Sequence, residues 1–165
     1  MISQMVAKMN KKVIVIGAGA AGTMASGVAA ENGADVLLLE RNEKIARKVM
    51  ITGKGRCNVT NNVDDVQSFI QNVPGNGRFL YSAFSSFDNR DVMDFFEAFG
   101  VELKVERGNR VFPVSDKAVD IVDALNRYIS DSGVKRKTER VTSLITENCE
   151  IKGVETEAGN TYYAD

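Results

Sequence analysis

The chain has 165 residues, and its 21 basic and 22 acidic side chains give a formal net charge of −1 at pH 7. This balance excludes the strong positive field that draws a protein to nucleic acid or to a membrane surface, so we expect neither as a partner. The hydrophobic share of 44% is typical of a globular protein with a real core. The absence of histidine excludes Ser-His-Asp and Cys-His catalysis, and histidine-ligated metal sites, within these residues.

The two cysteines, Cys57 and Cys149, lie far apart in the sequence and match no metal-binding spacing. We therefore predict no metal site. Two such isolated cysteines indicate a reducing cytoplasm, although the pattern leaves a single disulfide open.

The first eight residues carry no fold signal, and Met9 is a candidate functional start; we interpret residues 1–10 as an N-terminal extension. The basic pair at 11–12 and the uncharged stretch up to Ala30 also have the ingredients of a signal peptide or membrane anchor. Four glycines interrupt that stretch, and its apolar density falls after Ile16, which disfavours this alternative.

The most informative stretch begins with a β-branched apolar run at residues 13–16, which indicates a strand. The run leads directly into the pattern Gly-x-Gly-x-x-Gly at Gly17, Gly19 and Gly22. In a dinucleotide-binding unit, the first glycine permits the tight turn from strand to helix. The second lets the backbone approach a pyrophosphate, and the third lets the helix pack closely on the strand.

The residues after the glycine pattern complete this unit. The sequence predicts an amphipathic helix over 20–32, stopped by Gly33, and a second apolar strand over 35–39. Glu40 follows that strand at the spacing of the carboxylate that holds a ribose 2′-hydroxyl. The helix start offers free N–H groups to phosphates. Residues 13–40 therefore predict a site for an ADP-containing cofactor.

Residues 41–62 are basic, contain glycines and have no periodicity, and they leave the carboxyl end of the second strand, where open α/β sheets bind ligands. We therefore predict a ligand-facing loop. Short helices are expected at 64–71 and 78–84, and a stronger one at 89–99 whose aromatic residues belong to the core.

The second half of the chain predicts two short strands at 102–105 and 110–112 around a hairpin turn, and then a helix from 115 or 116 to 128. A third parallel strand is expected at 134–137. Three short runs follow, which indicate an antiparallel meander; they span 141–146, 149–155 and 161–163. Nothing after the meander returns to the sheet beside the first strand, so we expect the sheet to lack a strand.

Residues 51–61, Ile-Thr-Gly-Lys-Gly-Arg-Cys-Asn-Val-Thr-Asn, resemble the GGRCNxTN signature of the YhiN-like bacterial flavoproteins, a group that includes BaiN-type oxidoreductases and aminoacetone oxidase. Residues 111–118, Val-Phe-Pro-Val-Ser-Asp-Lys-Ala, resemble that family's second signature, a phenylalanine-proline segment before a helix. The resemblance covers the chain from Lys11. Lys54 stands where the family usually has a glycine.

The resemblance implies an α/β, Rossmann-like FAD-binding fold of the glutathione-reductase type with an antiparallel β-meander. On this basis residues 11–165 form a partial FAD-binding domain. The final sheet strand, the inserted substrate-side domain and the C-terminal segment of the family are then missing. FAD is the implied cofactor, with NAD(P)H as a possible electron donor.

The resemblance also implies roles for named residues. Gly17, Gly19 and Gly22, with the backbone of Ala20 and Ala21, would hold the FAD pyrophosphate. Glu40 would hold the adenosine ribose, with Arg41 beside the adenine and the main chain of Val141 at the adenine edge. The residues expected along the ribityl chain and isoalloxazine are Lys48, Gly53, Lys54, Gly55, Arg56, Cys57 and Asn58. A basic loop there would stabilise the negative charge of reduced flavin.

Within that loop, Cys57 follows the basic Arg56, which could lower the pKa of its thiol and allow a redox role. No partner cysteine lies nearby in the sequence, so we interpret Cys57 as a packing residue. Arg56 is expected to bind backbone carbonyls or flavin oxygens through its guanidinium, the alternative being an exposed loop arginine. Lys54 has the same two interpretations. No residue is a convincing general acid or base, so the catalytic residues are left unassigned.

The leading hypothesis is the FAD-binding portion of a cytoplasmic oxidoreductase that passes electrons through flavin N5 to or from a small organic substrate. Two alternatives stay open. The first is a non-catalytic, truncated nucleotide-binding module. The second is an NAD-binding dehydrogenase domain, which fits Glu40 but leaves the 51–61 segment unexplained. The sequence does not choose between reductase and oxidase, or assign a substrate or an oligomeric state.

Overall fold

The computed structural model describes residues 11–165; the predicted N-terminal extension and Met9 lie outside the described residues. Two compact units make up the described chain. Unit 1 consists of the residues up to Arg47 together with Leu125–Asp165, and unit 2 consists of Lys48–Ala124. Among residues 11–165, no helix is long and apolar enough to cross a membrane.

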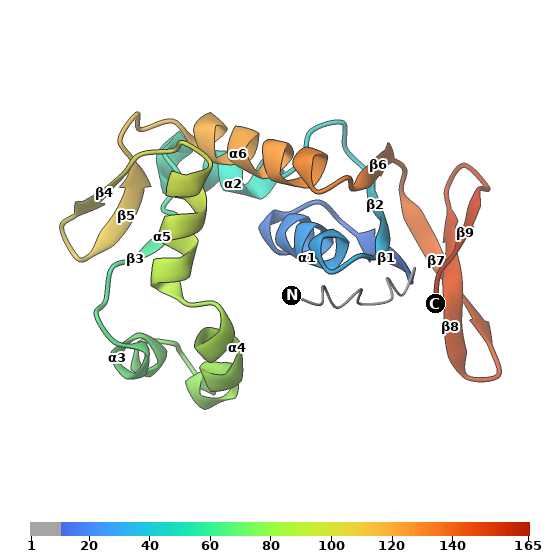
Figure 1. Cartoon of the computed structure of the whole chain (residues 1–165), viewed down its shortest axis with the longest axis horizontal. Coiled ribbons are helices and arrows are strands. Elements are labelled where there is room, and N and C mark those ends of the chain that lie inside the picture. The colour runs from blue at the N-terminus through green and yellow to red at the C-terminus, as the bar shows by residue number, and fades with distance from the viewer. Residues whose placement is uncertain (1–10) are drawn as a thin grey trace, which may run out of the picture. The chain divides into compact units, whose positions relative to one another are not determined.

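Unit 1 is built on a parallel sheet with the strand order β1-β2-β6 (Figure 1). The strands are β1 (Lys12–Ile16), β2 (Asp35–Glu40) and β6 (Lys135–Thr138). The central strand β2 is the most apolar, and its Val36, Leu38 and Leu39 are almost fully buried. Both strands of the predicted dinucleotide-binding unit and the third parallel strand are therefore confirmed.

Helix α1 (Ala20–Glu31) follows β1 and packs against β1 and β2 (Figure 1). Its buried residues are Thr23, Ser26 and Gly27, and each hydroxyl donates to the carbonyl one turn earlier. The predicted helix is confirmed, but its buried face consists of small residues rather than large apolar ones, and these let the backbone approach its neighbours closely. A Cβ on Gly27 would lie 2.1 Å from the ring of Tyr128, which belongs to helix α6 (Ala118–Asp131).

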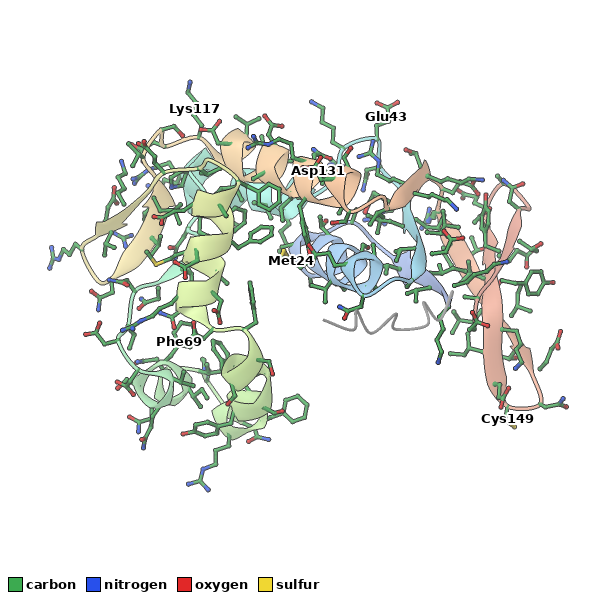
Figure 2. All side chains as sticks on the ribbon, in the orientation of Figure 1. Met24, Glu43, Phe69, Lys117, Asp131 and Cys149 are labelled. Carbon is green, nitrogen blue, oxygen red and sulfur yellow. The ribbon has the colours of Figure 1, made fainter. Side chains whose placement is uncertain are left out.

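The predicted antiparallel meander is confirmed as the second sheet of unit 1, with the order β7-β8-β9. Its strands are β7 (Val141–Glu147), β8 (Glu150–Thr156) and β9 (Thr161–Tyr163). Cys149 lies exposed in the turn between β7 and β8, at the tip of that hairpin (Figure 2). After β9, Asp165 reaches β1: its N–H donates to the Lys12 carbonyl at 3.2 Å, and its carboxylate accepts from the Lys12 N–H at 2.7 Å.

Unit 2 combines short helices with an antiparallel sheet in the order β3-β5-β4. The strands are β3 (Thr60–Asn61), β4 (Leu103–Glu106) and β5 (Arg110–Pro113). The helical segments are α3 (Val66–Gln71), the 3-10 helix η2 (Gly77–Leu80), α4 (Tyr81–Ser86) and α5 (Asn89–Ala98). The rings of Phe69 in α3 and Phe84 in α4 pack with centroids 4.7 Å apart. The predicted helices and hairpin are confirmed with small shifts in their bounds.

The prediction of one continuous loop over residues 41–62 is wrong. Helix α2 (Arg47–Ile51), the 3-10 helix η1 (Thr52–Gly55) and strand β3 all lie within this segment. The sequence carries no periodic apolar signal here because α2 buries none of its side chains and β3 is only two residues long. Hydrogen bonds of the backbone, rather than an apolar face, define these short elements.

Candidate functional site

The turn between β1 and α1 has the geometry that the glycine pattern predicts. Gly17 has a φ of 95°, in the left-handed region that favours glycine, and its N–H donates to the carbonyl of Leu39 at 2.7 Å. A Cβ on Gly22 would lie 1.9 Å from the carbonyl oxygen of Gly17. Glycine at 22 is therefore required for α1 to start this close to β1.

Gly19 differs from these two glycines because the chain itself does not need a glycine there. Its φ is −75°, and a Cβ would meet no atom within 4 Å. The space in front of Gly19 is open, and the adjacent Ala20 and Ala21 are exposed. α1 has no side-chain cap and no acidic residue in its first turn. An open glycine before an uncapped helix start fits a pyrophosphate, which would accept the free N–H groups.

Glu40 lies at the end of β2 and is bonded to this turn. Its Oε2 accepts from the N–H of Ala18 at 2.8 Å, and its Oε1 accepts from the N–H and the Nδ2 of Asn42 at 2.9 and 2.6 Å. Burial raises the pKa of the Glu40 carboxyl, but these hydrogen bonds outweigh burial and hold the pKa below its usual 4.5. Glu40 is therefore ionised at neutral pH.

Asn42 is a supporting residue that the sequence did not predict. Its Oδ1 accepts from Nη1 of Arg47 at 2.7 Å, so a chain of hydrogen bonds connects Arg47 through Asn42 to Glu40. The same segment is held a second time by the N–H of Ala46, which donates to the carbonyl of Ala18 at 2.7 Å. No sequence motif predicts these contacts, because they depend on the irregular backbone around Ala46, which has a φ of 51°.

A cavity of about 320 Å³ opens at the carboxyl end of the parallel sheet, within unit 1. Three of its lining residues, Glu40, Arg41 and Val141, were predicted for the adenosine of the cofactor, and a fourth, Gly17, for the pyrophosphate. The remaining lining residues are Ile16, Leu39, Glu139 and Arg140. The fold thus brings residues predicted for the ADP half of the cofactor from three separate segments to one cavity.

Glu139 organises the cavity wall that leads into β7. Its carboxylate accepts hydrogen bonds from the Tyr162 hydroxyl at 2.6 Å, from the Thr156 hydroxyl at 2.9 Å and from Nδ2 of Asn160 at 3.1 Å. These bonds, that of Tyr162 above all, lower the pKa of Glu139. The main chain at Val141 is therefore fixed by the meander. This signal was also missed, because it joins residues that the sequence keeps apart.

The residues predicted for the flavin half of the cofactor belong to unit 2. Lys48 lies in α2, and Asn58 is followed closely by β3. Between them the backbone is left-handed at Gly53, Lys54, Gly55 and Cys57, with φ values of 55°, 59°, 86° and 60°. A Cβ on Gly53 would lie 3.1 Å from Asn58 N and from Cε1 of Phe112. The loop is therefore tightly wound.

The structure shows the surroundings of three side chains of this loop. Cys57 is buried, and burial raises its thiol pKa, which supports packing over redox chemistry. The guanidinium of Arg56 donates to the carboxylates of Glu106 and Asp116, so it is neither an exposed loop arginine nor bound to backbone carbonyls. Lys54 is exposed.

The parallel sheet, the glycine turn, the acid after β2 and the meander define a Rossmann-like FAD-binding fold. Residues 11–165 match the family described as "HI0933-like protein Rossmann domain". The chain belongs to this family of flavin-dependent oxidoreductases. The family resemblance and the fold class predicted from the sequence are thereby confirmed.

Two curated relatives share the family. A 3-dehydro-bile acid delta(4,6)-reductase of Clostridium scindens is 32% identical over 126 residues, which cover 75% of this chain and 30% of that protein. A ribosomal RNA dihydrouridine synthase of Escherichia coli is 35% identical over 112 residues, which cover 68% of this chain and 27% of that protein. The matched part of the chain thus spans less than a third of the length of these relatives.

Solved structures agree on the fold. Thermovibrio ammonificans THI4 has a TM-score of 0.60 at 15% identity, and the match covers 91% of this chain and 48% of that one. L-Proline dehydrogenase from P. horikoshii has a TM-score of 0.53 at 17% identity, covering 93% of this chain and 50% of that one. At these identities the similarity concerns the fold alone.

Proposed function

We propose that this chain is the FAD-binding portion of an oxidoreductase in which electrons pass through flavin N5 to a small organic substrate. The observation that carries the proposal is Gly19. A Cβ at this position would contact no other part of the chain, and the backbone conformation does not require glycine. Close approach of a bound pyrophosphate would explain why the residue is glycine.

The cavity in unit 1 supports the adenosine half of this assignment. Glu40, ionised and aimed into the same region as the α1 start, would accept hydrogen bonds from a ribose, and Arg41 would lie beside the base. The main chain at Val141 would meet the adenine edge. Each of these roles needs only a hydrogen-bonding group in the right place, and the described residues provide such groups.

FAD, when bound, supplies the transfer of electrons at N5. The chain's own contribution would be to bind and orient it, since none of the described residues near these sites is a convincing general acid or base. The basic loop of unit 2 would act on the flavin half. Because two carboxylates already pair with Arg56, we assign the electrostatic contribution of this loop to its backbone N–H groups and to the exposed Lys54.

The names of the relatives favour a reductase over an oxidase. One relative is a reductase of a bile acid, and the other is a synthase of dihydrouridine, a name that denotes added hydrogen. We therefore propose reduction for the whole protein, with NAD(P)H as its electron donor. Since the net charge of −1 provides no basic excess for RNA, we keep a small organic molecule as the substrate class and a cytoplasmic location.

Calorimetric titration of the purified chain with FAD, FMN and NAD⁺ tests this proposal. We expect FAD to bind and ADP to compete with it, because the adenosine residues lie in a cavity of their own. FMN, which lacks adenosine, should bind much more weakly. Tighter binding of NAD⁺ than of FAD would favour the dehydrogenase alternative. A failure to bind FAD even in excess would favour the non-catalytic module.

A further inference from the structure

The two signature segments meet in unit 2, and Arg56 is the residue that joins them. The guanidinium carbon lies 4.2 Å from the centroid of the Phe112 ring, which is itself buried. Nε of Arg56 donates to Oδ1 of Asp116 at 2.8 Å, and Nη2 donates to the carboxylate of Glu106. Arg56 belongs to the 51–61 segment, whereas Phe112 and Asp116 belong to the 111–118 segment, which the proposed function leaves without a role.

Lys104 pairs with the same two carboxylates as Arg56. Its Nζ donates to Oδ2 of Asp116 at 2.8 Å and lies 3.7 Å from Oε1 of Glu106. We call Arg56, Lys104, Glu106 and Asp116 the Arg56 cluster. Two cations face two carboxylates, so the cluster is neutral, and its side chains are between 28% and 45% exposed. A planar guanidinium that is stacked and paired on two edges has a fixed position.

The loop that carries Arg56 needs such an anchor. Lys54 and Cys57 are not glycines, yet both have a left-handed backbone, a conformation that persists only when the surroundings impose it. Inside the loop, the N–H of Cys57 donates to the carbonyl of Thr52 at 3.1 Å, and the N–H of Arg56 donates to that of Gly53 at 3.3 Å. Outside it, the Phe112 ring lies so near Gly53 that a Cβ on Gly53 would be 3.1 Å from Cε1 of the ring.

We propose that Arg56 is a positioning residue, which fixes the loop 52–58 to the β4–β5 hairpin through Glu106 and Phe112 and to the turn after β5 through Asp116, and does not itself contact the flavin. The role of the fixed loop in flavin binding rests on the proposed function. The anchoring of the loop by Arg56 is independent of that function. The pairing also gives the phenylalanine-proline segment a role, which is to present the ring and the carboxylate that receive Arg56.

A double-mutant cycle tests the proposal with two readouts on the full chain. The variants are Arg56→Ala, Asp116→Asn and the combination of both, with Glu106→Gln as an independent second partner. Asn tolerates the left-handed backbone of Asp116, whose φ is 57°. The readouts are the rate of tryptic cleavage after Lys54, scored by mass spectrometry, and the affinity for FAD. Asp64→Asn is the matched control, because it removes an aspartate charge from an exposed ion pair with Arg90 in the same unit.

Each single variant should accelerate cleavage after Lys54 by about two- to fivefold, the scale of a partly exposed ion pair, and weaken FAD binding by a similar factor. The double variant should be no worse than Arg56→Ala alone, because both changes break one connection. Arg56→Lys, which keeps the charge but loses the fork and the stacking, should restore only part of both readouts. The control should match the unaltered chain.

Weaker FAD binding in Arg56→Ala, with Asp116→Asn and Glu106→Gln unchanged in both readouts, would overturn the proposal, since Arg56 would then contact the flavin directly. Additive effects in the double variant would overturn it as well. If the unaltered chain binds no FAD, the proposed function fails for this chain, and the rate of cleavage after Lys54 alone tests whether Arg56 fixes the loop. Non-additive acceleration in the double variant supports that role, and an unchanged cleavage rate contradicts it.

Discussion

The N–H of Ala18 donates to Oε2 of Glu40 at 2.8 Å, so the acid at the end of β2 is bonded to the turn that begins α1. One carboxylate thus belongs both to the phosphate turn and to the cavity beside Val141. In the proposed function, Glu40 would therefore connect the two halves of the ADP site, one for phosphate and one for ribose.

Glu40→Gln should weaken FAD binding by about tenfold or more, since charged hydrogen bonds to a ligand contribute roughly 1.5–3 kcal/mol. The amide oxygen can still accept from Ala18, but the amide NH2 would then face the two Asn42 donors, so a modest loss of stability without loss of the fold is expected. Calorimetry measures the affinity, and circular dichroism checks the fold. Glu43→Gln is the matched control, because Glu43 is exposed on the segment after β2 (Figure 2). Equal affinities of Glu40→Gln and the control would contradict the role of Glu40.

Asn42→Ala should weaken FAD binding although Asn42 is not among the residues that line the cavity. The variant removes the amide bond to Glu40 Oε1 and the acceptor for Arg47. We expect a loss smaller than that of Glu40→Gln, and no further loss when Asn42→Ala is added to Glu40→Gln, because both act through the same carboxylate. Additivity in calorimetric titrations would mean that Asn42 acts on its own.

Gly22→Ala should destabilise the chain by about 1–3 kcal/mol, the usual cost of overpacking. The new Cβ would lie 1.9 Å from the Gly17 carbonyl oxygen, and backbone must move to admit it. Gly19→Ala is the control within the same motif, because its Cβ meets nothing within 4 Å. Urea unfolding should separate the two variants, and equal midpoints would contradict the packing that we describe.

The carboxylates of the Arg56 cluster predict a loss of stability in acid. The hydrogen bond of Arg56 to Glu106, and those of Lys104 and Arg56 to Asp116, hold both pKa values below the usual 4.5 and 3.8. Their contribution is therefore complete above about pH 4.5 and is lost as the pH falls through the lowered values of the folded state. Urea midpoints between pH 6 and pH 3 measure it. Glu106→Gln with Asp116→Asn should flatten this dependence, and an unchanged slope would argue against the cluster.

Thiol reactivity should distinguish the two cysteines. Cys149 is exposed in the β7–β8 turn, whereas Cys57 is buried and its pKa is raised, so one fast and one slow equivalent are expected with a disulfide reagent at pH 8. Cys149→Ser should abolish the fast phase. A fast phase that survives this substitution would mean that Cys57 is the reactive thiol that its basic neighbour in the sequence first suggested.

The sequence predicted the elements that are defined by local chemistry. Strands β1 and β2 follow from apolar runs, and the roles of Gly17 and Gly22 follow from the turn and the helix packing that they permit. The sequence also predicted that Glu40, Arg41 and Val141 lie near one another, because the carboxyl ends of parallel strands meet at one edge of a sheet; their role in binding adenosine stays a prediction.

What the sequence did not predict depends on contacts between distant residues. Nothing in the local pattern of Arg56 reveals Glu106, fifty positions away, as its partner. The same holds for Glu139, whose three donors come from the meander. The short elements within 41–62 were missed because α2 has no buried face to produce a periodic signal.

The central claim, that an ADP-containing flavin cofactor explains Gly19, is tested most directly by the affinity of Gly19→Val for FAD. A Cβ at 19 meets no atom within 4 Å beyond the neighbouring residues, so the variant should fold, apart from the modest cost of a poor N-cap residue, and its side chain should enter the space where the pyrophosphate is proposed to bind. We predict a loss of FAD affinity of at least about tenfold, which corresponds to roughly 1.4 kcal/mol. Ala25→Val, at an exposed position further along α1, should leave the affinity unchanged. FAD binding by a stably folded Gly19→Val that equals binding by the unaltered chain would contradict the claim.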